Sequence, residues 1–215
     1  MIRAVLREQL RRIGPMLIAL TAMAAALPVL SVRVLLGQGL AADSMLILSC
    51  AASVAPAFPM LAGFIAVTVA LTAWQSDHDG GHVYALSLPI PRWHYALLRL
   101  GAAFLLLMPT LVGFALSATI VAAAIELPPG LHSYPLSLVV RFCALAIVAF
   151  SLFFAIASGS KKSAGWGLLV LLAVVILDVA YQSGSGSDYS PLFNMLLGTR
   201  SPLSFLLGQW SLVDV

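Results

Sequence analysis

Charged residues are scarce in this chain of 215 amino acids: Asp, Glu, Lys and Arg together make up 9%, whereas 61% of the residues are hydrophobic. A soluble domain carries about 25% charged residues, so this composition cannot cover a water-facing surface. Cysteine is scarce too, and Cys50 and Cys143 each lie inside an apolar run, which excludes a disulfide scaffold. The mean hydropathy of +1.05 excludes disorder and predicts an integral membrane protein.

Long apolar runs make up most of the chain. A membrane-crossing helix needs about 20 mostly apolar residues, and five runs meet that length: 15–36, 45–74, 98–127, 136–158 and 164–182. None shows the short alternating pattern of barrel strands. We therefore predict an all-α integral membrane protein, a polytopic bundle of five to six transmembrane helices. Pro56, Pro59 and Pro109 are placed to kink the long second and third runs.

Residues 1–14 predict an N-terminal amphipathic helix that lies in the membrane interface. One face of this helix carries Ile2, Leu6, Leu10 and Ile13, and the basic residues expected to contact lipid headgroups are Arg3, Arg7, Arg11 and Arg12. We expect the chain to turn into the membrane at Gly14 and Pro15, which leaves 15–182 as the transmembrane domain. The alternative is a plain helical extension of the first crossing.

Basic residues predict the orientation, because positively charged connections are retained in the cytoplasm. With the N-terminus inside, eight of the eleven Lys and Arg residues lie on the cytoplasmic side. This pattern favours topology signals over a nucleic-acid-binding face, and it predicts a multi-pass protein of a bacterial-type cytoplasmic (inner) membrane with a cytoplasmic N-terminus. The tail 183–215 begins with Ser-Gly repeats, and its apolar stretches are too short to span. We expect a re-entrant or interfacial extracytoplasmic tail, with an irregular sixth helix as the alternative.

The longest polar interruption, residues 75–99, reads QSDHDGGHVYALSLPIPRWHYALLR and is expected in the cytoplasm. Asp77, Asp79 and the following glycines are expected to end the second helix. An apolar stretch and a bend with two prolines follow, and the next helix begins at Arg92. A short amphipathic element between two membrane helices predicts a docking surface for another protein.

This loop resembles the segment between the second and third helices in permease (transmembrane) subunits of type-2 ABC transporters. The matching residues are Asp77, Asp79, Gly80, Leu86, Leu88, Pro89, Ile90, Arg92, Trp93, Tyr95 and Arg99. Pro91 stands where that pattern usually has Ser, and Asp-His-Asp replaces the usual acidic-plus-arginine opening. The N-terminal helix is also similar to the connector helix of those permeases.

The resemblance implies that the loop is a coupling element that docks on a cytoplasmic ABC ATPase subunit. The docking residues it implies are Asp77, Asp79, Gly80, Leu86, Leu88, Pro89, Arg92 and Arg99. It also implies a second permease copy or a paralogue as partner, with ATP and Mg²⁺ bound by the ATPase and no cofactor in this chain. Such permeases usually have six crossings, whereas we count five. The alternative is a non-transporting structural or anchoring subunit of a larger membrane complex.

No catalytic residues are predicted, and ATP hydrolysis is expected in a separate chain. A phosphate-binding loop needs Gly-x-x-x-x-Gly-Lys-Ser/Thr, and the stretch 158–163 lacks the first glycine. His78 and His82 have a spacing that could hold a metal on a helix, but the glycines between them disfavour that helix. We therefore expect solvated loop histidines and no metal site.

The remaining candidates lie within the apolar runs. Arg141 and Asp178 fall at a similar depth of consecutive helices, which predicts an ion pair in the outer leaflet. We favour the interpretation that this ion pair holds two helices together over the alternative that it belongs to a polar patch lining a substrate exit. Gly113 and Ser117 form a small face that allows a helix to approach closely, either within the chain or in a homodimer.

Overall fold

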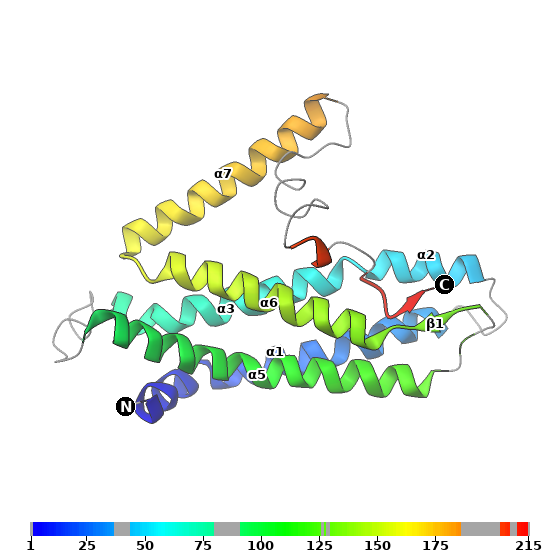
Figure 1. The fold of residues 1–215 in the computed structure, drawn as a ribbon, viewed down its shortest axis with the longest axis horizontal. Coiled ribbons are helices and arrows are strands. Elements are labelled where there is room, and N and C mark those ends of the chain that lie inside the picture. The colour runs from blue at the N-terminus through cyan, green and yellow to red at the C-terminus, as the bar shows by residue number, and fades with distance from the viewer. Residues whose placement is uncertain are drawn as a thin grey trace. The chain divides into compact units, whose positions relative to one another are not determined.

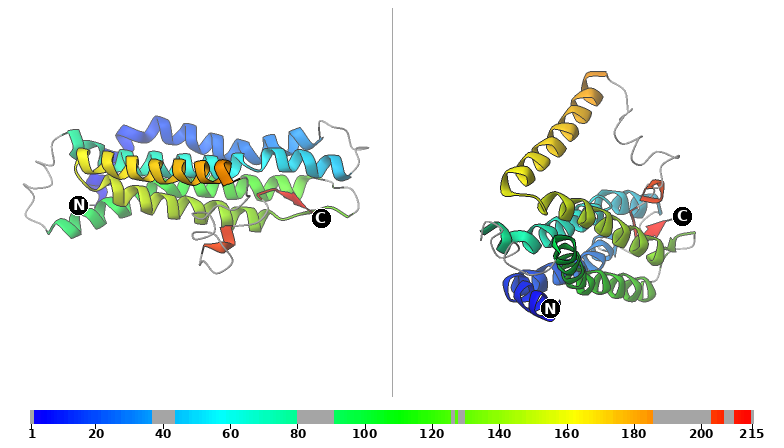
Figure 2. Two further views of the ribbon diagram at one scale, coloured as in Figure 1. Left: turned by 90° about the horizontal axis from the view of Figure 1, so that it is seen from above. Right: turned by 60° about the vertical axis from the view of Figure 1, so that its left-hand side comes forward.

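The computed structural model describes residues 2–36, 44–79, 91–125, 127, 130–185, 203–206 and 210–214 (Figures 1 and 2). Its helices are α1 (Ile2–Leu36), α2 (Ser44–Val54), α3 (Ala57–Asp79), α5 (Arg92–Ala124), α6 (Pro135–Ala157) and α7 (Lys161–Ser185). The shorter elements are strand β1 (His132–Ser133), the 3-10 helix η1 (Ser204–Leu206) and strand β2 (Val213–Asp214). The chain divides into two compact units, Met1–Phe154 with Gln209–Val215, and Ala155–Gly208.

Within the described residues, four helical stretches are long and apolar enough to cross a membrane. They are Val5–Val34, Ile47–Gln75, Trp93–Ala124 and Pro135–Ala157. These correspond to the first four predicted runs, so the prediction of an all-α, multi-pass membrane protein is confirmed. The residues of the fifth predicted run lie in helix α7.

The predicted turn at Gly14 and Pro15 is wrong. Helix α1 continues unbroken through both residues, as in the alternative of a helical extension. A buried stripe at helical spacing runs through this point, formed by Gln9, Ile13, Leu17, Leu20 and Ala24. Proline removes one backbone hydrogen bond, but continuous packing of the stripe on both sides of Pro15 keeps the helix intact.

The second predicted run forms two helices. The break lies at Ala55 and Pro56, where Pro56 ends the hydrogen-bonding ladder of α2 and α3 begins one residue later. At its other end α3 does not stop before the acidic residues, as the sequence suggested, but continues through Asp77 to Asp79. The contacts of Asp77 described below explain this extension.

Helices α1 and α5 form the main packing contact of the first unit, and they lie side by side in Figure 1. They run parallel, because Thr21 hydrogen-bonds to Thr110 at 3.1 Å and the Ser117 hydroxyl donates to the Ala25 carbonyl. A side chain at Gly113 would place its Cβ 3.1 Å from the Thr21 methyl group. The face of small residues that Gly113 and Ser117 form on α5 therefore packs against α1 of the same chain.

Aromatic rings join α3, α5 and α6 in the middle of this unit. Phe114 of α5 stacks on Phe142 of α6, with ring centroids 3.8 Å apart and planes at 11°. Phe58 of α3 meets the same Phe114 edge to face at 6.1 Å. All three side chains are at most 1% exposed, so they form the centre of the core.

The C-terminal residues return to the connection between α5 and α6. Strands β1 and β2 pair antiparallel, with His132 opposite Asp214 and Ser133 opposite Val213. The backbone N–H of Tyr134 extends the pairing by donating to the Leu212 carbonyl at 2.9 Å. These strands lie at the end of the unit where α5 finishes and α6 begins.

In the second unit, a serine cap starts helix α7. The Ser160 hydroxyl accepts the backbone N–H of Ser163 at 3.2 Å, which is the usual arrangement at a helix N-terminus. A Cβ at Gly167 would lie 3.0 Å from the Ile156 Cγ2 atom, so α7 begins in close contact with the end of α6. The stretch 158–163 is therefore a helix connection with its cap.

Candidate functional site

A buried ion pair joins the last turn of α3 to the second turn of α5. The Nε atom of Arg99 lies 3.1 Å from Oδ2 of Asp77, and its Nη2 atom donates to Oδ1 at 3.1 Å. Both residues are 1% exposed, and they are the only charged residues classed as buried within the described part of the chain. Charges at such a position are stable only when they are paired and hydrogen-bonded.

Tyr95 completes the hydrogen bonding of this pair. Its hydroxyl accepts from Arg99 Nε at 2.8 Å and donates to the two carboxylate oxygens of Asp77 at 3.0 and 3.1 Å. A further donor of Arg99, Nη1, binds the backbone carbonyl of Ala73. Tyr95 and Arg99 are four residues apart on α5, as are Ala73 and Asp77 on α3, so each helix contributes one face to the site.

Trp74, three residues before Asp77 on α3, packs against the ion pair. The guanidinium carbon of Arg99 lies 5.7 Å from the centroid of the Trp74 ring and 5.2 Å from that of Tyr95, within the range of cation–π attraction. Trp74 also packs on Phe154 of α6, with centroids 5.4 Å apart. We call Asp77, Tyr95, Arg99 and Trp74 the clamp cluster, because they join the last turn of α3 to the first two turns of α5, on either side of residues 80–90.

A second ion pair at the same end of the unit has a different character. Arg12 of α1 lies 3.7 Å from Asp79 of α3, and their side chains are 48% and 56% exposed. An exposed pair of this length contributes little to stability. The two acidic residues at the end of α3 therefore have different roles. Asp77 forms a buried ion pair that joins α3 to α5, whereas Asp79 is an exposed surface residue.

Two buried side chains, one in the clamp cluster and one on α1, have polar atoms without a hydrogen-bond partner among the described residues. They are the amide of Gln9, which is 6% exposed, and the indole N–H of Trp74. The parallel register of α1 and α5, which pairs Thr21 with Thr110, places Gln9 at the level of Arg99. Polar groups therefore concentrate in the interior at this end of the unit.

The structure corrects the docking assignment for two residues. Asp77 and Arg99 lie in the clamp cluster and present no surface to a partner. Asp79 is exposed, and Arg92 is the first residue of α5. Gly80, Leu86, Leu88 and Pro89 lie outside the described residues, so docking through them stays a prediction.

The other predicted residues lie on separate elements. Arg7, Arg11 and Arg12 are exposed on α1, and the side chain of Arg3 is not among those described, so the membrane-surface role stays a prediction. Arg141 lies on α6 and Asp178 on α7, in different units, so their ion pair stays a prediction. Within the described residues no three His, Cys, Asp or Glu side chains gather as metal ligands, and His82 lies outside them.

Sequence reasoning missed the clamp cluster, although a signal was present. Asp77 and Arg99 have opposite charges and flank one loop between two consecutive apolar runs. Consecutive helices joined by a short loop pack antiparallel, so these ends must meet. The same argument that paired Arg141 with Asp178 applies more directly to Asp77 and Arg99. The pattern hides this pairing because Asp77 directly follows an apolar run and precedes glycines, which is typical of a loop residue.

Comparison with known proteins identifies no relative. No family model matches the chain, and no curated protein and no solved structure does so either. The geometry of the clamp cluster and the resemblance of residues 75–99 are therefore the observations that point to a function.

Proposed function

We propose that this chain is the membrane-spanning permease subunit of an ATP-driven ABC transporter in a cytoplasmic membrane, coupled to a separate ATPase subunit through the loop between α3 and α5. One observation carries the proposal. The clamp cluster fastens the two helix ends that flank this loop, and the loop is the segment that resembles a coupling element. The substrate stays unassigned.

The clamp cluster suits a loop that transmits movement. A push on a loop moves its helices only if the loop ends are held firmly, because a loose hinge absorbs the displacement. Here the ends of α3 and α5 are joined by an ion pair with 3.1 Å contacts and a bridging hydroxyl, all buried. The two helices would therefore respond to the ATPase as one body and would change the access of substrate to the transport pathway.

The pairing of β1 with β2 supports an odd number of membrane crossings between the end of α6 and β2. If α6 spans the membrane, its end lies on the opposite side from β1, which precedes it. Since β2 pairs with β1, the chain must cross again between Ala157 and Val213. We propose that α7 is this fifth crossing, with the N-terminus in the cytoplasm and the C-terminus outside. With α7 as the fifth, residues 2–185 would contain five crossings.

The test is co-purification from the native membrane. Tagged full-length protein is extracted in mild detergent and its partners are identified by mass spectrometry, for the wild type and for the variants Leu86→Asp and Leu88→Asp. Ser158→Asp is the matched control, because Ser158 is exposed in the α6–α7 connection, on the same proposed side of the membrane. We expect an ABC ATPase with the wild type and the control, and its loss from both loop variants.

Two results would contradict the proposal. If membrane subunits co-purify without any ATPase, and the loop variants change nothing, the chain is a structural subunit of another complex. If an ATPase binds equally to wild type and both loop variants, the loop is not the docking surface. In either case the clamp cluster would serve stability alone.

A further inference from the structure

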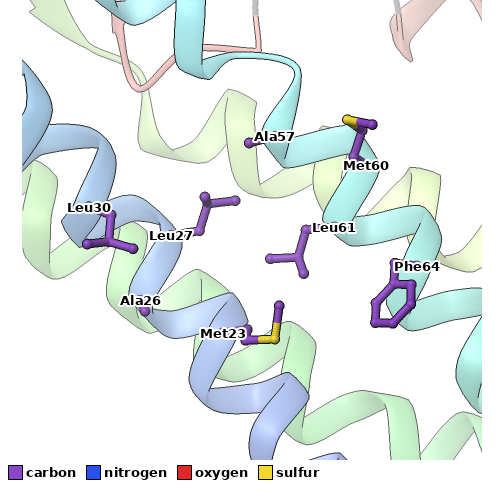
Figure 3. A pocket seen from close by; sticks show the side chains of 8 residues that line it. All are labelled: Met23, Ala26, Leu27, Leu30, Ala57, Met60, Leu61 and Phe64. Atoms are coloured by element: carbon purple, nitrogen blue, oxygen red, sulfur yellow. The ribbon is translucent and has the colours of Figure 1, made fainter.

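An apolar groove of about 460 Å³ lies between α1 and α3 (Figure 3). Its volume falls within the range of about 300–1,000 Å³ that is typical of small-molecule sites. Leu27 and Met23 of α1 and Leu61 of α3 point into the space between the two helices. The lining consists of Met23, Ala26, Leu27, Leu30, Ala57, Met60, Leu61 and Phe64.

The position of the groove defines the chemistry of its occupant. Its walls belong to two stretches that are able to span the membrane, Val5–Val34 and Ile47–Gln75. All eight lining side chains are apolar, so a polar ligand would find no hydrogen-bond partner among them. A groove of this kind at membrane depth takes hydrocarbon.

The groove is elongated along its two helices. Met23 and Leu30 are seven residues apart, about 10 Å along α1, and Ala57 and Phe64 are equally far apart on α3. An extended acyl chain can lie along this length and contact both helices.

A cation stands beyond one end of the groove. Arg33 lies in the last turn of α1, three residues after Leu30, and its side chain is exposed. Residues three apart share a helix side, and the rise between these two is about 4.5 Å. Arg33 is thus placed just outside the apolar lining, at the end of the membrane-spanning stretch. Guanidinium groups bind phosphate oxygens through paired hydrogen bonds.

We propose that the groove and Arg33 form a binding site for an anionic phospholipid, with an acyl chain in the groove and the phosphate at Arg33. Apolar contact alone gives little preference inside a bilayer, because lipid tails are as apolar as leucine. Selectivity must therefore come from the fit of the chain in the groove and from the charge at its end. This proposal does not rest on the transport function.

The experiment uses full-length protein in nanodiscs of phosphatidylcholine with a trace of phospholipid that carries a photoreactive diazirine in its acyl chain. One preparation contains a phosphatidylglycerol probe and the other a phosphatidylcholine probe. The labelled peptides are mapped by mass spectrometry for the wild type, for Arg33→Gln, and for the groove-filling variants Ala26→Trp and Ala57→Trp. Ala123→Trp is the control, because Ala123 is exposed on α5, a helix that contributes no residue to the groove lining.

We expect labelling to concentrate in residues 23–30 and 57–64 and to be stronger with the phosphatidylglycerol probe. Arg33→Gln should lower the ratio of phosphatidylglycerol to phosphatidylcholine labelling about fivefold, which corresponds to about 1 kcal/mol for one basic residue at a membrane surface. Each groove-filling variant should lower labelling with both probes severalfold, and Ala123→Trp should leave it unchanged. Two filling variants on different helices keep the test valid if one of them fails to fold.

Three results would overturn the proposal. Labelling spread evenly over all lipid-facing helices would show that the groove holds no preferred chain. An unchanged headgroup ratio in Arg33→Gln would remove Arg33 from the site. Efficient disulfide cross-linking between two copies that carry Met60→Cys, with no lipid labelling of the groove, would show that a second copy of the chain covers it.

Discussion

The clamp cluster makes a quantitative prediction about the stability of the bundle. Removing one partner of a buried, hydrogen-bonded ion pair leaves an uncompensated charge and costs about 3–5 kcal/mol. Asp77→Asn removes the negative charge next to Arg99, which keeps the Ala73 carbonyl, the Tyr95 hydroxyl and two aromatic rings. We expect it to lower the free energy of unfolding by about 3 kcal/mol, at the lower end of this range.

Arg99→Met should lower the free energy of unfolding by about 4–5 kcal/mol, more than Asp77→Asn does. The reason is that the Asp77 carboxylate would keep only the hydroxyl of Tyr95 as a donor in this cluster. The double variant removes both charges and leaves no buried ion. We expect it to cost no more than Arg99→Met alone. The two residues would then be coupled by about 3 kcal/mol.

Reversible unfolding in SDS, titrated in mixed micelles, measures these four free energies. Asp79→Asn is the matched control, because Asp79 lies two residues from Asp77 but is half exposed in its 3.7 Å contact with Arg12. It should cost less than about 0.5 kcal/mol. Two results would contradict a buried, coupled ion pair. One is a loss of unfolding free energy in Asp79→Asn as large as that in Asp77→Asn. The other is a loss in the double variant equal to the sum of the losses in Asp77→Asn and Arg99→Met.

Three further predictions concern packing and topology. Gly113→Val should destabilise the bundle by about 1–3 kcal/mol, because its Cβ would lie 3.1 Å from the Thr21 methyl group, and an unchanged thermal midpoint in detergent would argue against the α1–α5 contact. Phe142→Ala should cost about 3–5 kcal/mol in SDS unfolding, because it empties the centre of the core, and a loss below about 1 kcal/mol would mean that this stack is absent. In a cysteine-free background, an impermeant maleimide added to intact cells should label His132→Cys but not Ser160→Cys, and the reverse pattern would invert the proposed orientation.

The sequence predicted the membrane-spanning helices well, because the length and hydropathy of an apolar run decide whether a segment crosses a bilayer. The break at Pro56 was also visible, since a proline inside a run ends or bends a helix. The unbroken helix through Pro15 was only the alternative prediction. That outcome depends on the burial of residues on both sides of Pro15, and burial becomes known only when the packing partner is known.

The candidate site was only partly predictable for a related reason. A carboxylate at the end of an apolar run is typical of a loop residue, because ionisable groups avoid the membrane interior. Asp77 departs from that rule because Arg99 and Tyr95 on the next helix satisfy its charge. Single-sequence patterns describe each helix by itself, whereas the clamp cluster depends on a pair of helices.

The parallel packing of α1 on α5 has a consequence for how the protein is made. Thr21 and its partner Thr110 are 89 residues apart, so α1 enters the membrane well before the helix that covers it has been synthesised. Its buried stripe, including the amide of Gln9, must stay in contact with lipid or with the insertion machinery during that interval. The packing of α1 is therefore completed only after α5 has been synthesised and inserted. Ribosome pausing or truncation before α5 should leave an inserted but unpacked first helix, which membrane quality-control proteases would recognise.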